Sequence, residues 1–125
     1  MILGTGVDLA EVDRIRESIE RYGARFTNRI YTDREIAYVE RKANRYERYA
    51  ARFAAKEAGM KALGTGWRRG VRWQDIEVAN LPSGRPTLAL HGEAGAIAKQ
   101  LGVERISLSI THTSRDALAY VIFED

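Results

Sequence analysis

The sequence of 125 residues contains no cysteine and only two histidines, His91 and His112. Without cysteine there is no disulfide, no thiolate-ligated zinc, no iron–sulfur cluster and no thiol nucleophile. With two histidines, a metal centre built mainly from imidazole is nearly excluded. Any chemistry must therefore come from carboxylates, hydroxyls and basic side chains.

Long hydrophobic runs are also missing. No segment approaches the roughly 18 consecutive apolar residues of a membrane-spanning helix. The first residues lack a basic region and are interrupted by Asp8, unlike a secretory signal. Hydrophobic residues still make up 45% of the chain, which suffices for one folded core. We expect a single domain over residues 1–125, located in the cytoplasm and not associated with a membrane.

Positive charge is concentrated in the first half of the chain. Residues 14–56 hold 12 basic and 6 acidic side chains, a net of +6, whereas the whole chain carries +3. Most of the basic residues are arginine, whose planar guanidinium suits carboxylates and phosphates. Two interpretations are open: a solvated helical face or a surface for an anionic partner.

The hydrophobic pattern predicts an α+β fold, an antiparallel sheet packed with helices. Helices are expected where apolar residues recur at helical spacing, and Thr32 with Glu35 forms a capping-box pattern. Strands are expected where the spacing changes to two. The predicted strands are residues 2–8, 71–78 with a turn around Gln74-Asp75, 87–90, 105–111 and 117–123, and the predicted helices are 12–22, 32–41, 44–63 and 92–101.

Asp8 is expected where the first strand gives way to a helix. A carboxylate there can cap the helix or its turn. Alternatively, a rigid strand end holds it as a metal ligand. The residue alone does not decide between these roles.

Glu57 and Lys61 share one face of the predicted helix 44–63, because they are four positions apart. The simpler interpretation is an exposed ion pair. However, Phe53 and Met60 flank Glu57, so the carboxylate borders the apolar face and needs partners. Magnesium and a phosphate would supply both, since magnesium prefers a few carboxylates together with phosphate oxygens and water.

Two further features carry weaker signals. Gly64 follows the helix 44–63, where a helix cap explains it fully, although Gly64-Thr65-Gly66 would also let a phosphate approach the backbone. Gly59 lies inside that helix, where it costs about 1 kcal/mol relative to alanine, and such a glycine often permits a close approach. His112 follows a strand among hydroxyl side chains, as a surface residue or as a ligand for an anion.

Four segments in this order resemble the holo-[acyl-carrier-protein] synthases, the short 4′-phosphopantetheinyl transferases. The resemblance runs from residue 2 to about residue 123. The segments are Gly6-Val7-Asp8-Leu9 with Glu11, Arg14 and Ile15; Ala51-Arg52-Phe53-Ala54-Ala55-Lys56-Glu57-Ala58 with Lys61; Gly84-Arg85-Pro86; and Ser109-Ile110-Thr111-His112-Thr113.

The resemblance implies the 4′-phosphopantetheinyl transferase fold and transfer of the phosphopantetheine arm of coenzyme A to a serine of apo-acyl carrier protein, with adenosine 3′,5′-bisphosphate released. Fatty acid biosynthesis is the implied pathway. It also implies a homotrimer with sites shared between subunits, and strands 105–111 and 117–123 are the expected contact. Asp8 and Glu57 match the Mg²⁺ ligands, and Glu57 and Lys61 are the expected catalytic pair. The implied coenzyme A-binding residues are Arg52, Lys61, Gly64, Arg85, Pro86, His112 and Thr113.

Within this interpretation the basic segment has a specific partner, because acyl carrier proteins are acidic. The docking candidates are Arg14, Arg21 and Arg25, which lie off the apolar stripe of helix 12–22, with Arg45 as a weaker one. The general base stays open between Glu57 and a water on the metal, and a Glu57 that ligates the metal favours the water.

Two other functions compete with the transferase. A nucleic-acid-binding module would explain tyrosines 38, 46 and 49 among arginines. The net charge of +3 is modest for that role, and these tyrosines have core-like spacing, so we expect no nucleic acid partner. A protein that binds coenzyme A without catalysis is the third alternative.

Overall fold

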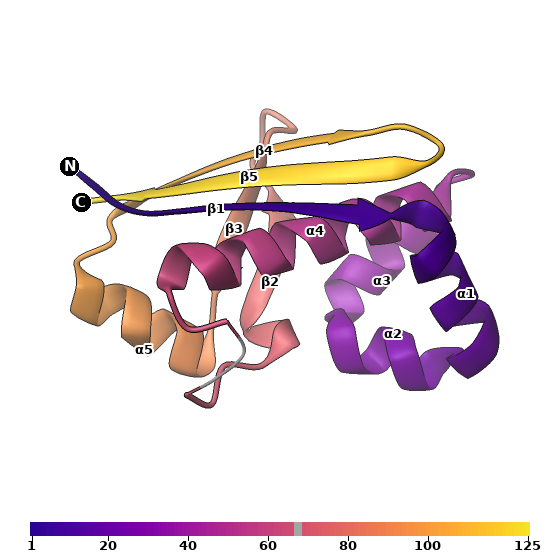
Figure 1. Cartoon of the computed structure of the whole chain (residues 1–125), viewed down its shortest axis with the longest axis horizontal. Coiled ribbons are helices and arrows are strands. Elements are labelled where there is room, and N and C mark those ends of the chain that lie inside the picture. Colours follow the sequence, from indigo (N-terminus) through magenta and orange to yellow (C-terminus); the bar gives the residue numbers. More distant parts are fainter. Residues whose placement is uncertain (67–68) are drawn as a thin grey trace.

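The computed structural model describes residues 1–66 and 69–125, and it confirms the α+β class (Figure 1). One antiparallel sheet has the strand order β1-β5-β4, and a second pairs β2 with β3. The strands are β1 (Ile2–Glu11), β2 (Ile76–Asn80), β3 (Pro86–Leu90), β4 (Arg105–His112) and β5 (Asp116–Glu124). The helices are α1 (Val12–Tyr22), α2 (Ala24–Ile30), α3 (Asp33–Glu40), α4 (Arg45–Leu63), the short 3₁₀ helix η1 (Trp73–Asp75) and α5 (Gly92–Leu101).

The long helix α4 runs beneath the three-stranded sheet and forms the centre of the core (Figure 1). Every second residue of β5 faces this helix, because side chains alternate along a strand. These inward residues are fully buried: Ala117, Ala119, Val121 and Phe123. The helix contributes small side chains to the core, and its alanines at positions 50, 51, 54, 55, 58 and 62 are all buried.

Glycines let β1 lie directly on α4. A β-carbon at Gly6 would overlap the carbonyl oxygen of Ala58, and one at Gly4 would overlap that of Ala62. Gly59 faces the other sheet, where a β-carbon would come within 3.0 Å of Ile76 and 3.1 Å of Leu88. The close approach expected at Gly59 is therefore present, and it lets the β2–β3 hairpin pack on α4.

Helix boundaries follow the sequence signals closely. Thr32 and Glu35 form the predicted capping box at the start of α3. Gly64 and Gly102 end α4 and α5 in the left-handed conformation that favours glycine. No helix of the described residues has the length and apolar composition needed to cross a membrane.

Several expectations about the first 31 residues were wrong. The first strand continues past Asp8 to Glu11, because its main chain pairs with β5 as far as Asp116. The chain also forms α2, which the sequence pattern did not predict. Tyr22, expected on the buried stripe of α1, is 49% exposed because the helix ends there and Gly23 turns the chain away.

The strand β5 occupies the middle of its sheet and is not an edge. Residues 117–123 were predicted as a subunit contact because a hydrophobic edge there would otherwise be exposed, and that reason was wrong. On the outer face of β1 and β5, exposed apolar side chains are Val7, Leu9, Leu118 and Tyr120.

Candidate active site

A cleft of about 410 Å³ between β1, α1 and α4 contains two of the predicted site residues, Asp8 and Glu57. Asp8 faces α4 because it alternates with the outward residues Val7 and Leu9. Gly6 brings the strand onto Ala58, the residue after Glu57. The close packing of β1 on α4 thus places both carboxylates in one cleft, whose other lining residues include Arg14, Ile15, Ser18, Phe26 and Phe53.

The two carboxylates influence each other electrostatically. Burial is the largest cause that raises the pKa of Glu57, from 4.5 to about 7, and hydrogen bonding with Asp8 and its negative charge add to it. The positive charge of Lys61 acts in the opposite direction but is outweighed. Burial and the neighbouring Asp8 therefore make the Glu57 carboxyl harder to ionise than a solvated glutamate.

Lys61 completes this group, although not in the way its spacing suggested. Its ammonium donates to the Asp8 carboxylate at 3.0 Å and to the main-chain carbonyl of Val7 at 2.9 Å. The simple ion pair with Glu57 is thus replaced by a contact with Asp8. The alternative role of Asp8 as a helix cap was wrong, since Glu11 precedes α1 and no side chain caps it.

The residues Asp8, Glu57, Lys61 and Gly64 form what we call the carboxylate group. Gly64 is included in this group because it ends α4, three positions after Lys61. Its left-handed conformation (φ 80°) makes it a helix cap as well.

Arg52 lies elsewhere on α4. Its side chain is 94% buried, since its exposed fraction is 6%, and its guanidinium stacks on the ring of Tyr38 at 4.4 Å. It donates to Asn80 at 3.5 Å, while its buried Nε atom has no partner. Burial lowers the pKa of Arg52, and the charge of Glu35 opposes that change.

His112 lies at the end of β4 and contacts α4. Its Nδ1 atom is 2.9 Å from the carboxylate of Glu47, and both side chains are about one quarter exposed. Thr113 begins the following turn, where its hydroxyl accepts from the main-chain amides of Arg115 and Asp116 at 3.1 Å each. These two hydrogen bonds to the Thr113 hydroxyl stabilise the turn.

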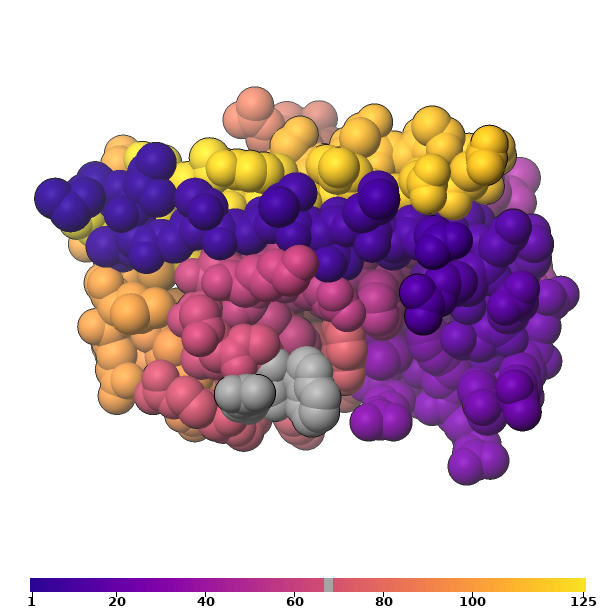
Figure 2. Space-filling view, in the orientation of Figure 1, coloured from indigo at the N-terminus to yellow at the C-terminus, as the bar shows by residue number. Residues whose placement is uncertain are grey.

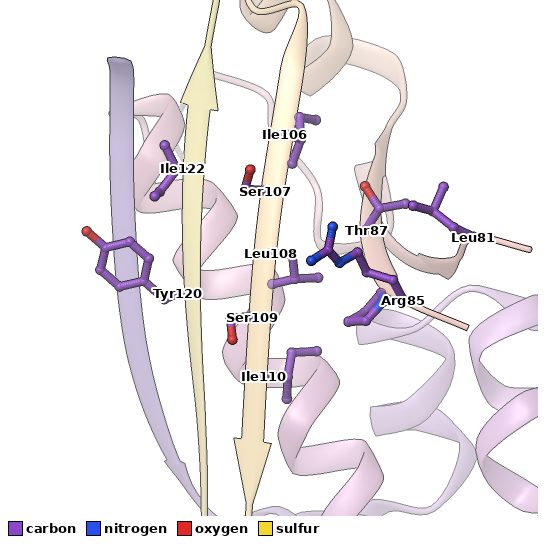
Figure 3. A pocket seen from close by; sticks show the side chains of 11 residues that line it. Leu81, Arg85, Thr87, Ile106, Ser107, Leu108, Ser109, Ile110, Tyr120 and Ile122 are labelled. Atoms are coloured by element: carbon purple, nitrogen blue, oxygen red, sulfur yellow. The ribbon is translucent and has the colours of Figure 1, made fainter. Parts of the chain in front are cut away.

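Arg85 and Pro86 line a groove of about 460 Å³ beside β4 (Figure 3). They lie at the start of β3, and the turn before them is held to Asn80 through the Gly84 carbonyl at 3.0 Å. The opposite wall presents Ser107, Ser109 and Tyr120. The residues Arg52, Arg85, Pro86, His112 and Thr113 form what we call the basic group.

The two groups flank opposite edges of one sheet. Asp8 lies on β1, which is one edge of the order β1-β5-β4, and Figure 2 shows β1 along the near side of the molecule with β5 behind it. The groove of Arg85 and Pro86 borders β4, the other edge, and His112 ends that strand. Arg52 is the exception, since it lies on α4, five positions before Glu57. One chain therefore brings Asp8, Glu57 and Lys61 together but places Arg85, Pro86 and His112 at the other sheet edge.

The predicted docking arginines also lie at different places on the molecule. Arg14 lines the cleft with Asp8 and Glu57. Arg25 lines an adjoining groove that shares Ser18 and Phe26 with that cleft. Arg21 is exposed on the same helix as Arg14 and lies over the ring of Tyr22 at 5.5 Å. Arg45 starts α4 twelve positions before Glu57, about 18 Å away along the helix axis, and stacks on Tyr46.

Sequence reasoning missed several participants. Glu47, the partner of His112, and Tyr38, beneath Arg52, carried no local signal because their partners are far away in the chain. The buried ion pair of Glu35 and Lys56, 2.7 Å apart, was missed for the same reason. Tyr49, a candidate for base stacking, is fully buried, as its core-like spacing in the sequence indicated.

The carboxylate group suits a magnesium ion by its chemistry. Among residues 1–66 and 69–125, no three acidic, histidine or cysteine side chains gather as a metal site. Magnesium prefers a few ionised carboxylates, with phosphate oxygens and water completing its shell. Asp8 and Glu57 would hold such an ion, because both carboxylates line one cleft.

Comparison with known proteins assigns the family. The family model described as the 4′-phosphopantetheinyl transferase superfamily matches residues 4–121. The chain belongs to the 4′-phosphopantetheinyl transferase superfamily. This confirms the resemblance seen in the sequence motifs, and it agrees with the α+β architecture.

Relatives within the superfamily match over the full chain. A holo-[acyl-carrier-protein] synthase of Solibacter usitatus is 72% identical over 100% of both chains, and that of Koribacter versatilis is 58% identical over the same extent. The crystal structure of the Neisseria meningitidis enzyme covers 100% of both chains with 33% identity and a TM-score of 0.90. The Helicobacter pylori enzyme in complex with coenzyme A covers 96% of this chain and 99% of its own, with 28% identity and a TM-score of 0.84.

Proposed function

We propose that this protein transfers the 4′-phosphopantetheine group of coenzyme A to a serine of apo-acyl carrier protein. The products are holo-acyl carrier protein and adenosine 3′,5′-bisphosphate. The observation that carries the proposal is that Asp8 and Glu57 line one cleft and that Lys61 donates to Asp8 at 3.0 Å. The superfamily match and the names of the relatives support the same reaction.

The carboxylates act as the cation-binding half of the site. A magnesium ion, when bound, supplies positive charge that neutralises phosphoryl oxygens during transfer. Both carboxylates would be ionised when they coordinate a cation, and the positive charge of the cation would favour loss of the Glu57 proton. The rigid backing of Gly6 on Ala58 holds both side chains in place without substrate.

Lys61 provides the mobile positive charge. Its side chain is 54% exposed, so the ammonium can leave the Val7 carbonyl for an incoming diphosphate. Negative charge develops on the leaving bisphosphate during transfer, and a nearby ammonium stabilises it. Lys61 therefore acts on the leaving group, while Asp8 and Glu57 act on the bound cation.

The separation of the two groups supports a site shared between copies of the chain. Coenzyme A is a long substrate, and the carboxylate and basic groups flank opposite sheet edges of one molecule. A second copy packed on the exposed outer residues Val7, Leu9, Leu118 and Tyr120 would cover an apolar face. We propose a homotrimer, in which each site combines the carboxylate group of one subunit with the basic group of the next.

The carrier protein is proposed to approach over α1 and α2. Arg14 and Arg25 line two adjoining grooves at the open side of the carboxylate cleft. Phe26 contributes to both grooves, so apolar and basic contacts alternate there. Such a surface suits an acidic protein partner that must deliver a serine to Glu57 and Lys61. The proposed setting is fatty acid biosynthesis in the cytoplasm.

Two other functions predict different results. A coenzyme A-binding protein without catalysis would bind the nucleotide and leave the carrier protein unmodified. A nucleic-acid-binding protein would retain RNA or DNA on a filter, with an affinity that falls steeply with salt. The burial of Tyr49 removes one of the three stacking candidates and weighs against this second alternative.

The proposal is tested with Glu57→Gln and the matched substitution Glu93→Gln on the exposed face of α5. Transfer to a purified apo-carrier protein should be lost in the first variant and retained in the second, with both folded by circular dichroism. Full activity of Glu57→Gln in excess EDTA would overturn the proposal.

A further inference from the structure

Lys56 forms a buried ion pair directly behind the carboxylate cleft. Its ammonium is 2.7 Å from the carboxylate of Glu35, and both side chains are 0% exposed. The same ammonium donates to the main-chain carbonyl of Ile76 at 2.7 Å and to that of Trp73 at 3.2 Å. One side chain of α4 thus contacts α3, η1 and β2.

Glu35 is equally well satisfied. It accepts from the main-chain amide of Thr32 at 2.8 Å and from that of Val78 at 2.9 Å. The carboxylate therefore fixes the start of α3 and the strand β2 while it pairs with Lys56. The ion pair and the bonds to Ile76 and Val78 are buried, and those to Trp73 and Thr32 are partly buried. The pair is therefore a junction between elements and not a surface contact.

Stability alone does not account for this junction. Removing two charges from water is costly, and replacing a buried ion pair with neutral residues of similar volume is often neutral or stabilising. Lys56 precedes Glu57, and adjacent helical side chains point about 100° apart. Lys56 therefore holds the buried side of α4 at the position where Glu57 faces Asp8.

The helix is held from two sides at this point. On one side Gly6 lies on the carbonyl of Ala58. On the other, the three bonds of Lys56 prevent α4 from rolling about its axis. A small roll would move Glu57 along the cleft and change its approach to Asp8.

A second connection runs from Lys56 to the wall of the same cleft. The carbonyl that it binds belongs to Trp73, whose ring stacks on Phe53 with centroids 4.9 Å apart. Phe53 lines the cleft with Asp8 and Glu57. Lys56 therefore supports the aromatic wall of the cleft through Trp73, in addition to the position of Glu57.

We propose that Lys56 is a positioning residue, whose buried pair with Glu35 sets the rotation of α4 that presents Glu57 to Asp8. The inference rests on the proposed transferase function for its kinetic consequence. Its geometric consequence, weaker binding of a divalent cation by the carboxylates, does not depend on that function.

The test uses the double variant Glu35→Gln/Lys56→Met in the full chain. It removes both charges while preserving side-chain volume, whereas Lys56→Met alone would leave Glu35 buried and unpaired. Lys99→Met, on the exposed face of α5, is the matched control. Three quantities are measured: the unfolding temperature, kcat and KM for both substrates, and Mn²⁺ binding by calorimetry.

We expect a folded double variant whose kcat falls by about tenfold or more, since small misplacements of a catalytic group are costly. KM for coenzyme A and for carrier protein should stay near the native values, and Mn²⁺ affinity should weaken by about tenfold, as loss of a ligand-orienting contact does. Lys99→Met should match the native protein in every measurement.

Two results would overturn the proposal. A double variant that folds with native kcat and native Mn²⁺ affinity would show that the junction does not position Glu57. A double variant that does not fold would show that the junction serves stability instead. Absence of transfer by the native protein would count against the proposed function, and Mn²⁺ binding would then decide the positioning role by itself.

Discussion

Gly6 on β1 lies against the main-chain carbonyl of Ala58 on α4 so closely that a β-carbon cannot fit between them. The contact joins an edge strand to the central helix at the residues next to Asp8 and Glu57. Two carboxylates 49 positions apart in the chain thereby reach one cleft. The arrangement of the site therefore depends on this contact.

Replacing Gly6 with alanine should force β1 away from α4. Overpacking of this kind costs about 1–3 kcal/mol of unfolding free energy, and the displaced Asp8 should also weaken transfer. Denaturant unfolding and carrier-protein assays measure the two effects. Thr5→Ala, on the exposed neighbour, is the control, and equal stability of both variants would contradict the packing argument.

Glu57→Gln should abolish transfer yet stabilise the metal-free protein in alkaline buffer. The pKa of Glu57 is raised from 4.5 to about 7, so between these values the folded state binds more protons than the unfolded state. Stability from this group therefore falls as pH rises through that interval. Glutamine does not titrate, so Tm in EDTA should be a few degrees above native at pH 8 and equal to native at pH 4.

This prediction fails if the Tm difference between Glu57→Gln and the native protein is the same at both pH values. Such a result would mean that Asp8 and burial do not perturb Glu57.

Sharing of the site between subunits predicts complementation. Glu57→Gln and Arg85→Glu, each inactive alone, alter different groups at opposite sheet edges. Co-expression of the two should restore about a quarter of native activity, because random mixing leaves that fraction of sites with both groups intact. Activity no greater than the sum of the separate variants would place the whole site within one chain.

Arg14→Glu should raise KM for the carrier protein by about tenfold and leave coenzyme A binding unchanged. A rim charge mainly steers an oppositely charged partner, so the native association rate should fall with salt more steeply than that of the variant. Lys99→Glu, which makes the same charge change on the distant helix α5, should have little effect. An equal loss for both substrates would argue against docking over α1.

Local features of this fold could be predicted from sequence because local residues determine them. The helix α4 has a continuous apolar spacing and a terminal Gly64, and the Thr32–Glu35 cap needs only four residues. Helix α2 was missed because seven residues show only two apolar positions on one face, Phe26 and Ile30. The full extent of β1 was missed because its pairing with β5 joins opposite ends of the chain.

The site could be predicted in its members but not in its arrangement. The motif resemblance selected Asp8, Glu57 and Lys61, which do converge. It did not show that Lys61 bonds Asp8, or that Arg85 and His112 lie at the other sheet edge. Glu35 and Lys56 are 21 positions apart, and Lys56 bonds Trp73 and Ile76 at separations of 17 and 20, for which a single sequence carries no signal.

Intact-mass spectrometry of an apo-acyl carrier protein, incubated with this protein, coenzyme A and magnesium, tests the central claim most directly. The account predicts a mass increase of one phosphopantetheine on the carrier serine, with release of adenosine 3′,5′-bisphosphate, and no increase in EDTA or with Glu57→Gln. A carrier protein of unchanged mass, despite measurable binding of coenzyme A, would contradict it.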